Sequence, residues 1–383
     1  MTEIEIADSV SSLPRAEWDE LVGDGSPFLE WDWLACLEES GAVGDGTGWT
    51  ARPLVARREG RLVAACPLYV KGNSEGEFVF DFAWADAAIR GGIRYYPKLL
   101  VGVPFTPVTG QRILTASGED RSLWIRRFAE KLRETCLANE LSSVHVNFCL
   151  PEEIPPLEAA GFVRRLGIQY QWRNPGYGSF GDFLARFRSK RRNQILRERR
   201  DVRAAGVSIE ILEGEAIPDE LFPHMYRIYL STLEGNPWGR QYLNERFFEL
   251  LRERFRQRLC FIVARQGSEV VAGTLNVRKG AALYGRYWGA LRPIRNLHFD
   301  VCYYSAVEHC IAERLERFEP GAGGDFKQVR GFDAQPTFSA HFLAEPRLAR
   351  SVALHLETER AQVERGIAWI REQSALKPDD PTA

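Results

Sequence analysis

His298 and Asp300, in the segment "LHFDVCYY" (297–304), are the clearest candidates for acid–base chemistry in this sequence. Side chains two positions apart share a face only if the chain is extended. In that case the carboxylate would orient the imidazole, which is the arrangement of a general base. If the segment is already helical, Asp300 is instead expected to cap the start of the helix. The sequence leaves both interpretations open.

The segment "GEFVFDFAWADA" (76–87) places two aspartates in an apolar run that alternates like a strand. As a strand it would carry aromatic rings on one face, ending with Trp84 and Asp86, and it would carry Asp81 on the other face. Burying an unpaired carboxylate costs on the order of several kcal/mol. We therefore expect a partner for each aspartate: an arginine for Asp81, and either a ligand or a structural ion pair for Asp86.

Two further segments combine aromatic rings with a cation. In "YGRYWG" (284–289), an extended chain puts Arg286 and Trp288 on one face, between glycines that allow a ligand close to the backbone. The segment "YYPKLL" (95–100) supplies Tyr95, Tyr96 and Lys98 ahead of a proline-rich loop of the kind that forms pocket walls. We expect both segments to bind substrate. The alternatives are an exposed cross-strand cluster and a brace between two domains.

Residues 183–203 form a strongly basic segment, with nine lysines and arginines against two acids. Ser179 and Asp182 have the spacing of a capping box, so we predict a helix over 180–203. Many such runs are solvated helix faces, but three consecutive cations repel one another unless an anion lies among them. Lys190, Arg191 and Arg192 are therefore predicted to bind phosphate, whether of CoA, of tRNA or of a lipid-linked precursor.

The composition excludes several protein classes. The chain has 383 residues with 50 Lys+Arg against 52 Asp+Glu, so the molecule as a whole has no polyanion-binding character. We see no signal peptide and no apolar run long enough for a membrane helix, and we expect a cytoplasmic protein without an integral membrane segment. The seven scattered cysteines predict reduced thiols. Cys302, His309 and Cys310 lie in an apolar helical stretch, where we expect core packing and no metal site.

The two halves of the chain repeat one order of elements. The segments "LVARREGRLVAACPLYV" (54–70) and "FIVARQGSEVVAGTLNV" (261–277) each read as a hairpin, and a predicted third strand follows each one, over 78–87 and 282–291. A helix then follows in each half, over 121–140 and 299–318, and an amphipathic pattern closes the chain over 346–373. We predict an α/β protein of two tandem domains, 1–172 and 173–377, with a tail, 378–383, that lacks ordered structure.

This order, with "LEAAGF" (157–162) between helix and strand, resembles the fold of the GCN5-related N-acetyltransferases (GNAT). Longer motifs resemble the FemAB-like N-acyltransferases, which are expected to be two GNAT-like mixed-sheet domains in tandem. These motifs include "SPFLEWDWLACLEESG" (26–41), "PFTPVTG" (104–110), "SKRRNQILRERR" (189–200) and "RGF" (330–332), besides the segments quoted above. The resemblance implies transfer of an acyl or aminoacyl group to an amine, with a peptidoglycan precursor as a candidate acceptor.

Amide formation needs a neutral amine, a proton acceptor near it and donors for the developing oxyanion. We expect Trp84 to line the acceptor channel and Asp86 to bind or deprotonate the amine, while His298, with Asp300, serves as the general base. The amine would attack the acyl donor directly, without a covalent enzyme intermediate.

One departure from the family pattern affects the site. Ahead of "RGF" a Glu-His-Lys triplet is expected, but the chain reads Asp325-Phe326-Lys327, so no histidine is available there as an obligatory base. Lys327 and Arg330 remain as predicted substrate-binding residues.

The acyl donor is left open by the sequence. Neither strand-to-helix connection has a clean Gly-rich phosphate loop, and "GAGGD" (321–325) is a weak match. We expect no tightly bound cofactor; the donor is acyl-CoA or, as the resemblance to the Fem enzymes implies, aminoacyl-tRNA. Two other functions stay in view: a non-catalytic module that binds tRNA or a peptidoglycan-like ligand, and a CoA-dependent small-molecule acetyltransferase. Oligomeric state is not specified by these patterns.

Overall fold

The computed structural model describes residues 2–233 and 239–377 of the chain, which form two compact units. The first unit comprises the residues up to Ile168 together with Pro336–Arg365. The second comprises Gln169–Gln335 and the described residues from Gly366 onward. Residues 336–365, which a contiguous second domain would include, fold with the first unit because their strand pairs with a strand there. The predicted tail, 378–383, lies outside the described residues.

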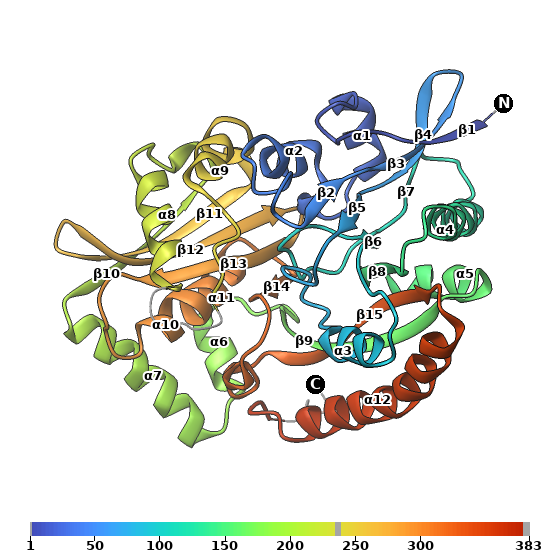
Figure 1. Cartoon of the computed structure of the whole chain (residues 1–383). Coiled ribbons are helices and arrows are strands. Elements are labelled where there is room, and N and C mark those ends of the chain that lie inside the picture. The colour runs from blue at the N-terminus through green and yellow to red at the C-terminus, as the bar shows by residue number, and fades with distance from the viewer. Residues whose placement is uncertain (1, 234–238, 378–383) are drawn as a thin grey trace. The chain divides into compact units, whose positions relative to one another are not determined.

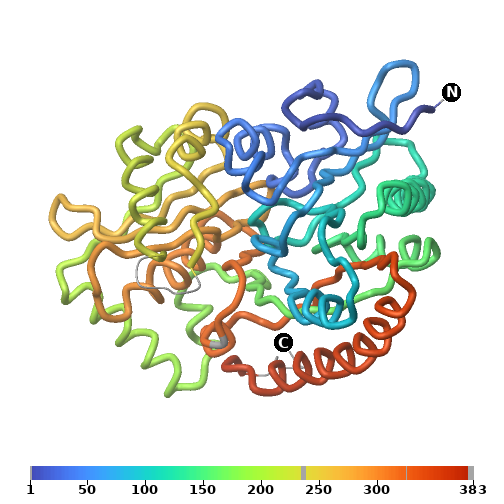
Figure 2. The backbone as a smooth tube through the Cα atoms, in the orientation of Figure 1, coloured from blue at the N-terminus to red at the C-terminus, as the bar shows by residue number. Residues whose placement is uncertain are grey.

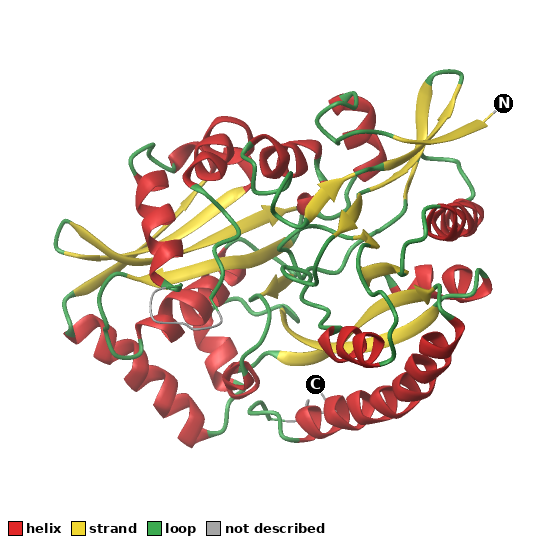
Figure 3. Cartoon of the chain, viewed as in Figure 1, coloured by secondary structure: helices red, strands yellow, loops and turns green. Residues whose placement is uncertain are grey.

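The first unit is a mixed α/β structure (Figures 1 and 3). Its strands are β1 (Thr2–Ile6), β2 (Trp49–Ala51), β3 (Leu54–Arg58), β4 (Arg61–Cys66), β5 (Leu68–Lys71), β6 (Lys98–Val101), β7 (Leu114–Thr115), β8 (Ser143–Cys149), the first part of β9 (Val163–Arg173) and most of β15 (Asp333–Leu343). Its helices are α1 (Arg15–Val22), α2 (Trp31–Glu39), α3 (Phe82–Arg90), α4 (Arg121–Ala138), α5 (Ile154–Ala159) and most of α12 (Pro346–Glu372).

Two sets of paired strands build this unit. One is antiparallel, in the order β1-β3-β4-β7. In the other, β15, β8, β6, β5 and β2 are successive neighbours, and β6 and β8 run parallel while the other pairs are antiparallel. The trace in Figure 2 shows how β15, from late in the chain, returns to lie beside β8.

Strand β8 separates two environments within the first unit. Val144 and Val146 pack into the apolar core with α4. Because alternate residues of a strand point to opposite faces, Ser143, His145 and Asn147 point to the other side, and all three are buried as well. The strand therefore carries an apolar core on one face and a buried polar layer on the other.

The second unit has the strand order β10 (Val207–Glu213), β11 (Leu259–Gln266), β12 (Glu269–Lys279), β13 (Ala282–Ala290), β14 (Arg317–Glu319) and the last part of β9. Neighbouring strands are antiparallel except for β13 and β14, which are parallel. Its helices are α6 (Phe180–Ala185), α7 (Ser189–Ala204), α8 (Leu221–Ser231), α9 (Glu245–Leu250), α10 (Leu297–Phe299), the π-helix η6 (Asp300–Tyr304), α11 (Ser305–Ala312) and the 3-10 helix η7 (Asp325–Arg330). Among the residues that the structure describes, no helix is both long enough and apolar enough to cross a bilayer.

Most predicted elements are confirmed. Both hairpins form, as β3–β4 and β11–β12, and the third strand of the second half is β13. The helix over 121–140 is α4, and the C-terminal amphipathic pattern is α12. The capping box is present: the Ser179 side chain accepts a hydrogen bond from the Asp182 backbone N–H. The basic segment, however, forms two helices, α6 and α7, because the chain breaks at residues 186–188.

The prediction of a strand over 76–87 is wrong. The chain forms helix α3 there, from Phe82 to Arg90, and Trp84, Ala85 and Ala88 are its buried residues. That spacing lies on one side of a helix and packs against α12 in a small apolar cluster. The alternating aromatic residues that suggested a strand are divided between the loop, which holds Phe78 and Phe80, and the first turn of the helix, which holds Phe82 and Trp84.

Candidate functional site

The carboxyl ends of β13 and β14 define the candidate site of the second unit. The two strands pair over three register positions, the last being Tyr284 with Glu319. Beyond it the backbones remain close at two glycines: a Cβ on Gly285 would lie 3.3 Å from the Pro320 carbonyl carbon, and one on Gly321 would lie 3.2 Å from the Gly285 oxygen. Ligands of open α/β sheets bind outside the carboxyl ends of parallel strands. The residues that follow these ends are therefore the candidates for ligand contact.

His298 lies in a cage of aromatic rings beside these strand ends. Its ring centroid is 4.7 Å from that of Trp288, 5.3 Å from that of Tyr303 and 5.7 Å from that of Phe326. Burial, together with the nearby positive charges of Arg330 and Lys327, lowers the pKa of His298 to about 4. The imidazole is therefore neutral at neutral pH and can accept a proton or a hydrogen bond.

The structure does not pair His298 with Asp300. The segment is helical from Leu297, so positions 298 and 300 point to different sides of the helix. Asp300 accepts hydrogen bonds from Arg199 Nε (3.1 Å) and Ser305 Oγ (3.2 Å). The expectation of an extended His–Asp pair is wrong. The alternative role as a helix cap is wrong as well, because Asp300 stands inside the helical segment.

Lys327 and Arg330, both on η7, are buried but differ in how their donors are used. The Lys327 ammonium donates to the backbone oxygens of Gly321 (2.6 Å) and Ala322 (3.3 Å), and burial lowers its pKa to about 8. Two of its three N–H groups are thus used. Arg330 donates to Tyr304 Oη (2.8 Å) and to both oxygens of Glu198 (3.2 and 3.1 Å), and its guanidinium lies 3.4 Å from the Phe299 ring centroid. Arg330 therefore holds neighbouring elements together, whereas one N–H donor of Lys327 has no partner among the described residues.

A β-bulge at Arg286 interrupts the regular alternation that predicted Arg286 and Trp288 on one face of β13. The register of β12 with β13 shifts so that Arg286 is an extra residue between the partners of Leu275 and Asn276. Such bulges redirect side chains and are frequent at active sites. Trp288 turns to His298, while the Arg286 guanidinium lies 5.2 Å from the Tyr287 ring centroid.

Part of the predicted phosphate-binding run lines a cavity at the start of α7. The cavity has a volume of about 260 Å³ and its lining includes Arg188, Lys190, Arg191 and Val329. Its described lining holds these three cations and no carboxylate, whereas Arg192 is absent from it. Neighbouring residues of a helix point in different directions, which explains why Arg192 does not line this cavity with Lys190 and Arg191. Val329 lies on η7 with Lys327 and Arg330, so the cavity adjoins the segment that carries them.

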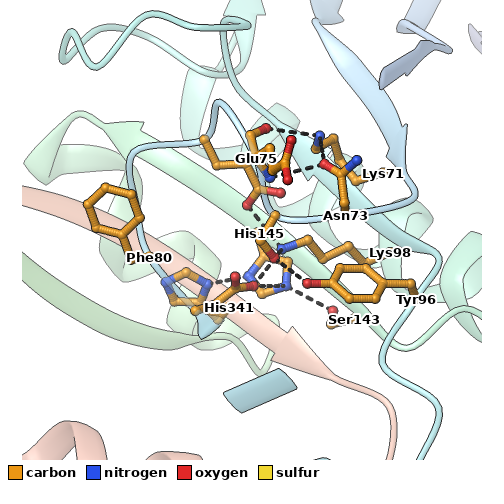
Figure 4. A network of polar contacts seen from close by, with 12 residues as sticks. Lys71, Asn73, Glu75, Phe80, Tyr96, Lys98, Ser143, His145 and His341 are labelled. Atoms are coloured by element: carbon orange, nitrogen blue, oxygen red, sulfur yellow. Dashed lines mark hydrogen bonds and ion pairs between the residues drawn. The ribbon is translucent and has the colours of Figure 1, made fainter. Parts of the chain in front are cut away.

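The first unit contains a second cluster, built around Lys98 (Figure 4). The fully buried Lys98 ammonium donates to Ser74 Oγ (2.9 Å), to Glu77 Oε2 (3.0 Å) and to Asp81 Oδ2. Burial raises the pKa of Glu77 to about 7. For Asp81, burial is outweighed by Lys98 and the other donors, which hold the pKa at about 2. One ionised carboxylate therefore balances the lysine.

The predicted Tyr95 and Tyr96 both join this cluster. Tyr95 Oη donates to Asp81 Oδ2 at 2.6 Å, and Tyr96 Oη lies 2.7 Å from Ser74 Oγ. Of the three residues predicted in "YYPKLL", only Tyr96 is partly exposed. Asp81 is thus paired with Lys98 and Tyr95, and the prediction of an arginine partner is wrong.

Two histidines extend the cluster, and sequence reasoning missed them. His145 and His341 face each other from β8 and β15 with their Nδ1 atoms 2.6 Å apart. Ser143 Oγ lies 2.8 Å from His145 Nε2, and Ser339 Oγ lies 2.9 Å from His341 Nε2. The sequence held a signal for this pair: Ser-x-His occurs in both strands, at "SVH" and "SAH".

The structure places Trp84 and Asp86 apart. Trp84 is buried beside the histidine pair, with its ring centroid 5.0 Å from that of His341 and the Arg165 guanidinium 4.8 Å from its own ring. Asp86 is exposed on the outer side of α3. A helix in place of the predicted strand separates the two residues, and the buried aspartate of this region is Asp81.

Comparison with known proteins agrees with this architecture. Residues 9–378 match the model of the FemAB-like family, described as peptidoglycan biosynthesis/recognition. No curated protein matches the sequence.

Solved structures that are similar to the chain include the following three. FemX has a TM-score of 0.56 at 12% identity, with 89% of this chain and 98% of FemX covered. L-PGS from Bacillus licheniformis has a TM-score of 0.52 at 10% identity, with 84% and 94% covered. A conserved protein of unknown function from Bacteroides thetaiotaomicron has a TM-score of 0.53 at 10% identity, with 89% and 100% covered. The predicted family is confirmed, and so is the predicted α/β fold class.

Proposed function

The chain belongs to the FemAB-like family, and from that premise we propose that it is an N-acyltransferase whose reaction takes place in the second unit. It transfers an acyl or aminoacyl group to an amine, and the description of the family favours a peptidoglycan precursor as acceptor. One observation carries the proposal: a buried lysine with a spare N–H donor lies close to a neutral, ring-enclosed histidine, at the carboxyl ends of parallel strands.

Each residue has a role that follows from its surroundings. As the amine nitrogen attacks the acyl carbonyl, a C–N bond forms and negative charge develops on the carbonyl oxygen. We propose that the third N–H of Lys327 stabilises that charge, and the burial of this lysine would strengthen the interaction. His298 is neutral and can take the proton that the attacking amine loses, returning it to the departing alcohol or thiol as the bond to the donor breaks.

Direct attack on the donor fits the state of the neighbouring thiol. Burial raises the pKa of Cys302 well above its usual value, although Lys327 opposes the shift. A covalent acyl-enzyme would need a thiolate, which is the reactive form of cysteine. Cys302 is therefore a protonated thiol and a poor nucleophile at neutral pH.

The cavity beside α7 supports a donor that carries phosphate. Arg188, Lys190 and Arg191 converge on it, and charge-assisted contacts from such cations bind phosphate oxygens strongly. Both aminoacyl-tRNA and acyl-CoA present phosphates, so the cavity fits either donor. We propose that it holds the phosphate-bearing part of the donor while its acyl group reaches Lys327.

The test is an activity assay with each donor class. Wild-type protein is incubated separately with aminoacyl-tRNA and acetyl-CoA, together with a peptidoglycan-type peptide that carries a free amine, and the amide product is measured by mass spectrometry. We expect product with one donor class, and a loss of about 10²–10³ in rate for Lys327→Ala. The matched control is Lys131→Ala, which removes a partly exposed lysine on α4.

Two results would count against the proposal. Full activity of Lys327→Ala would show that the reaction takes place elsewhere. If neither donor gave product while charged tRNA still raised the melting temperature, the chain would be a binding module without catalysis.

A further inference from the structure

We propose that Glu213, Cys260 and His309 form a binding site for a zinc-type divalent metal ion in the second unit. The site uses none of the residues to which the acyl transfer reaction is assigned. The sequence alone predicted core packing for the stretch that contains His309, because that stretch is apolar and helical, and the other two residues lie far from it in the chain.

The fold brings these three residues to one point from three elements. Glu213 is the last residue of β10 and Cys260 the second residue of β11, and they are register partners in the antiparallel pair. Directly opposed residues project from the same face of a sheet. His309, on α11, reaches that face, and its Nε2 is 2.8 Å from Glu213 Oε1. One ligand atom from each residue lies within 4.8 Å of the others.

The donor set has the chemistry of a zinc site. It combines one sulfur, one imidazole nitrogen and one carboxylate oxygen, the three kinds of atom that Zn²⁺ binds in proteins. Three protein ligands leave one tetrahedral position for water. Cys260 is fully buried, whereas side-chain exposure is 11% for His309 and 29% for Glu213, so an ion can reach the site from the side of these two residues.

The surroundings fix the carboxylate and balance the charge. Arg278 donates to Glu213 Oε2 at 2.6 Å and also to Glu313 Oε2 at 3.2 Å. It thereby orients Glu213 through one oxygen and leaves Oε1 directed at His309, as outer partners of metal ligands do. A divalent ion with the Cys260 thiolate and the Glu213 carboxylate is neutral, and Glu313 offsets Arg278. Binding releases the thiol proton to solvent, moves the imidazole proton of His309 from Nε2 to Nδ1, and replaces the His309–Glu213 hydrogen bond with two metal–ligand bonds.

Cobalt provides a direct probe of this geometry. The full chain is dialysed against a chelator and titrated with Co²⁺, and absorption is recorded. We expect one equivalent to bind with a thiolate-to-cobalt charge-transfer band in the near ultraviolet and intense visible bands of tetrahedral cobalt, all of which Zn²⁺ abolishes. Cys260→Ser should remove the charge-transfer band, and His309→Gln and Glu213→Gln should each weaken Co²⁺ binding by about tenfold or more.

The controls separate metal binding from folding and from catalysis. Cys302→Ser changes a thiol outside the site, on η6 directly before the helix α11 that carries His309, and should leave the bands unchanged. Circular dichroism without metal checks that each variant is folded; if Cys260→Ser does not fold, the less buried His309→Gln decides. A protein that binds no Co²⁺, or whose charge-transfer band survives Cys260→Ser, would overturn the site and show a plain His309–Glu213–Arg278 ion-pair network. Because the readout is absorption, failure of the acyl transfer proposal leaves this result unaffected.

Discussion

His145 and His341 form a hydrogen bond between strands that lie almost 200 positions apart in the sequence, with 2.6 Å between their Nδ1 atoms. Only one proton fits between two nitrogens at that distance, so protonating the second ring would set two N–H groups against each other. Burial, with Lys98 nearby, lowers the pKa of His145 to about 3, and burial with His145 nearby lowers that of His341 well below its usual value. The pair is therefore neutral at neutral pH.

This pair makes stability depend on pH in a defined sense. Unfolded histidines bind protons below about pH 6.5, whereas the folded pair does not. Its contribution to the free energy of unfolding is therefore complete above about pH 6.5 and is lost as the pH falls toward 3. The free energy of unfolding, measured with urea at several pH values between 7 and 4, should fall less steeply with decreasing pH in the double variant His145→Leu/His341→Leu than in wild type. The raised pKa of Glu77 changes stability with pH in the opposite sense, but Glu77 is present in both proteins, so its effect cancels in the comparison. The same dependence of unfolding free energy on pH in both proteins would contradict this prediction.

Lys98→Met should be among the most destabilising substitutions in the first unit. It leaves Asp81 and Glu77 buried without their cation, and breaking a buried ion pair on one side costs about 3–5 kcal/mol. Lys131→Met, at a partly exposed lysine, should change the free energy of unfolding by less than about 0.5 kcal/mol. Guanidinium unfolding of the two variants measures the difference. Similar values would mean that the Lys98 cluster does not stabilise the unit.

The two aspartates of "GEFVFDFAWADA" should respond differently to the same change. Asp81→Asn weakens the contacts with Lys98 and Tyr95 and should lower stability by about 2 kcal/mol or more. Asp86→Asn, on the exposed side of α3, should leave the melting temperature unchanged. Turnover of the folded Asp86→Asn protein then tests directly whether that carboxylate acts on the amine.

The pH profile of the reaction should report Lys327. Its pKa of about 8 means that the ammonium is lost as the pH rises through that value, so kcat/KM should stop rising with pH and fall above about pH 8. In Lys327→Arg the cation persists, and any remaining activity should lack this alkaline fall. A wild-type profile that keeps rising to pH 10 would argue against a role for the Lys327 charge.

The cationic cavity should set the salt dependence of donor binding. Replacing Lys190 or Arg191 by Ala should raise KM for the donor several-fold and, if the donor is tRNA, reduce the slope of log affinity against log salt by about 1 per residue. Arg200→Ala, on the same helix but away from the cavity lining, is the matched control. Equal effects of all three substitutions would indicate a general charge effect with no specific site.

Much of the fold could be read from the sequence because hairpins and amphipathic helices leave local signals. The turns at Gly60 and Gly267 and the apolar period of 121–140 sufficed for β3–β4, β11–β12 and α4. The strand predicted over 76–87 failed because Phe80 and Phe82 mimic alternation, although both rings are exposed and stack on each other. Local pattern gave no indication that packing against α12 would select a helix.

The site was less predictable, since it depends on contacts between distant segments. His298, Trp288 and Lys327 were predicted separately, and the structure groups them through the ends of β13 and β14. The pairing of His298 with Asp300 failed because a π-helix starts where an extended chain was considered. His145 could have been found only by noticing that Ser-x-His recurs in two strands that β15 brings together.

The return of residues 336–365 to the first unit has a consequence for biosynthesis. Until that segment leaves the ribosome, β8 lacks its neighbour β15, and His145 has no ring to share its proton with. The earliest part of the chain to be made is thus among the last to close, after residues 169–335 of the second unit have been translated. A nascent chain halted before residue 336 should therefore be cleaved by protease around β8. Pulse proteolysis of the nascent chain on stalled ribosomes can detect this cleavage.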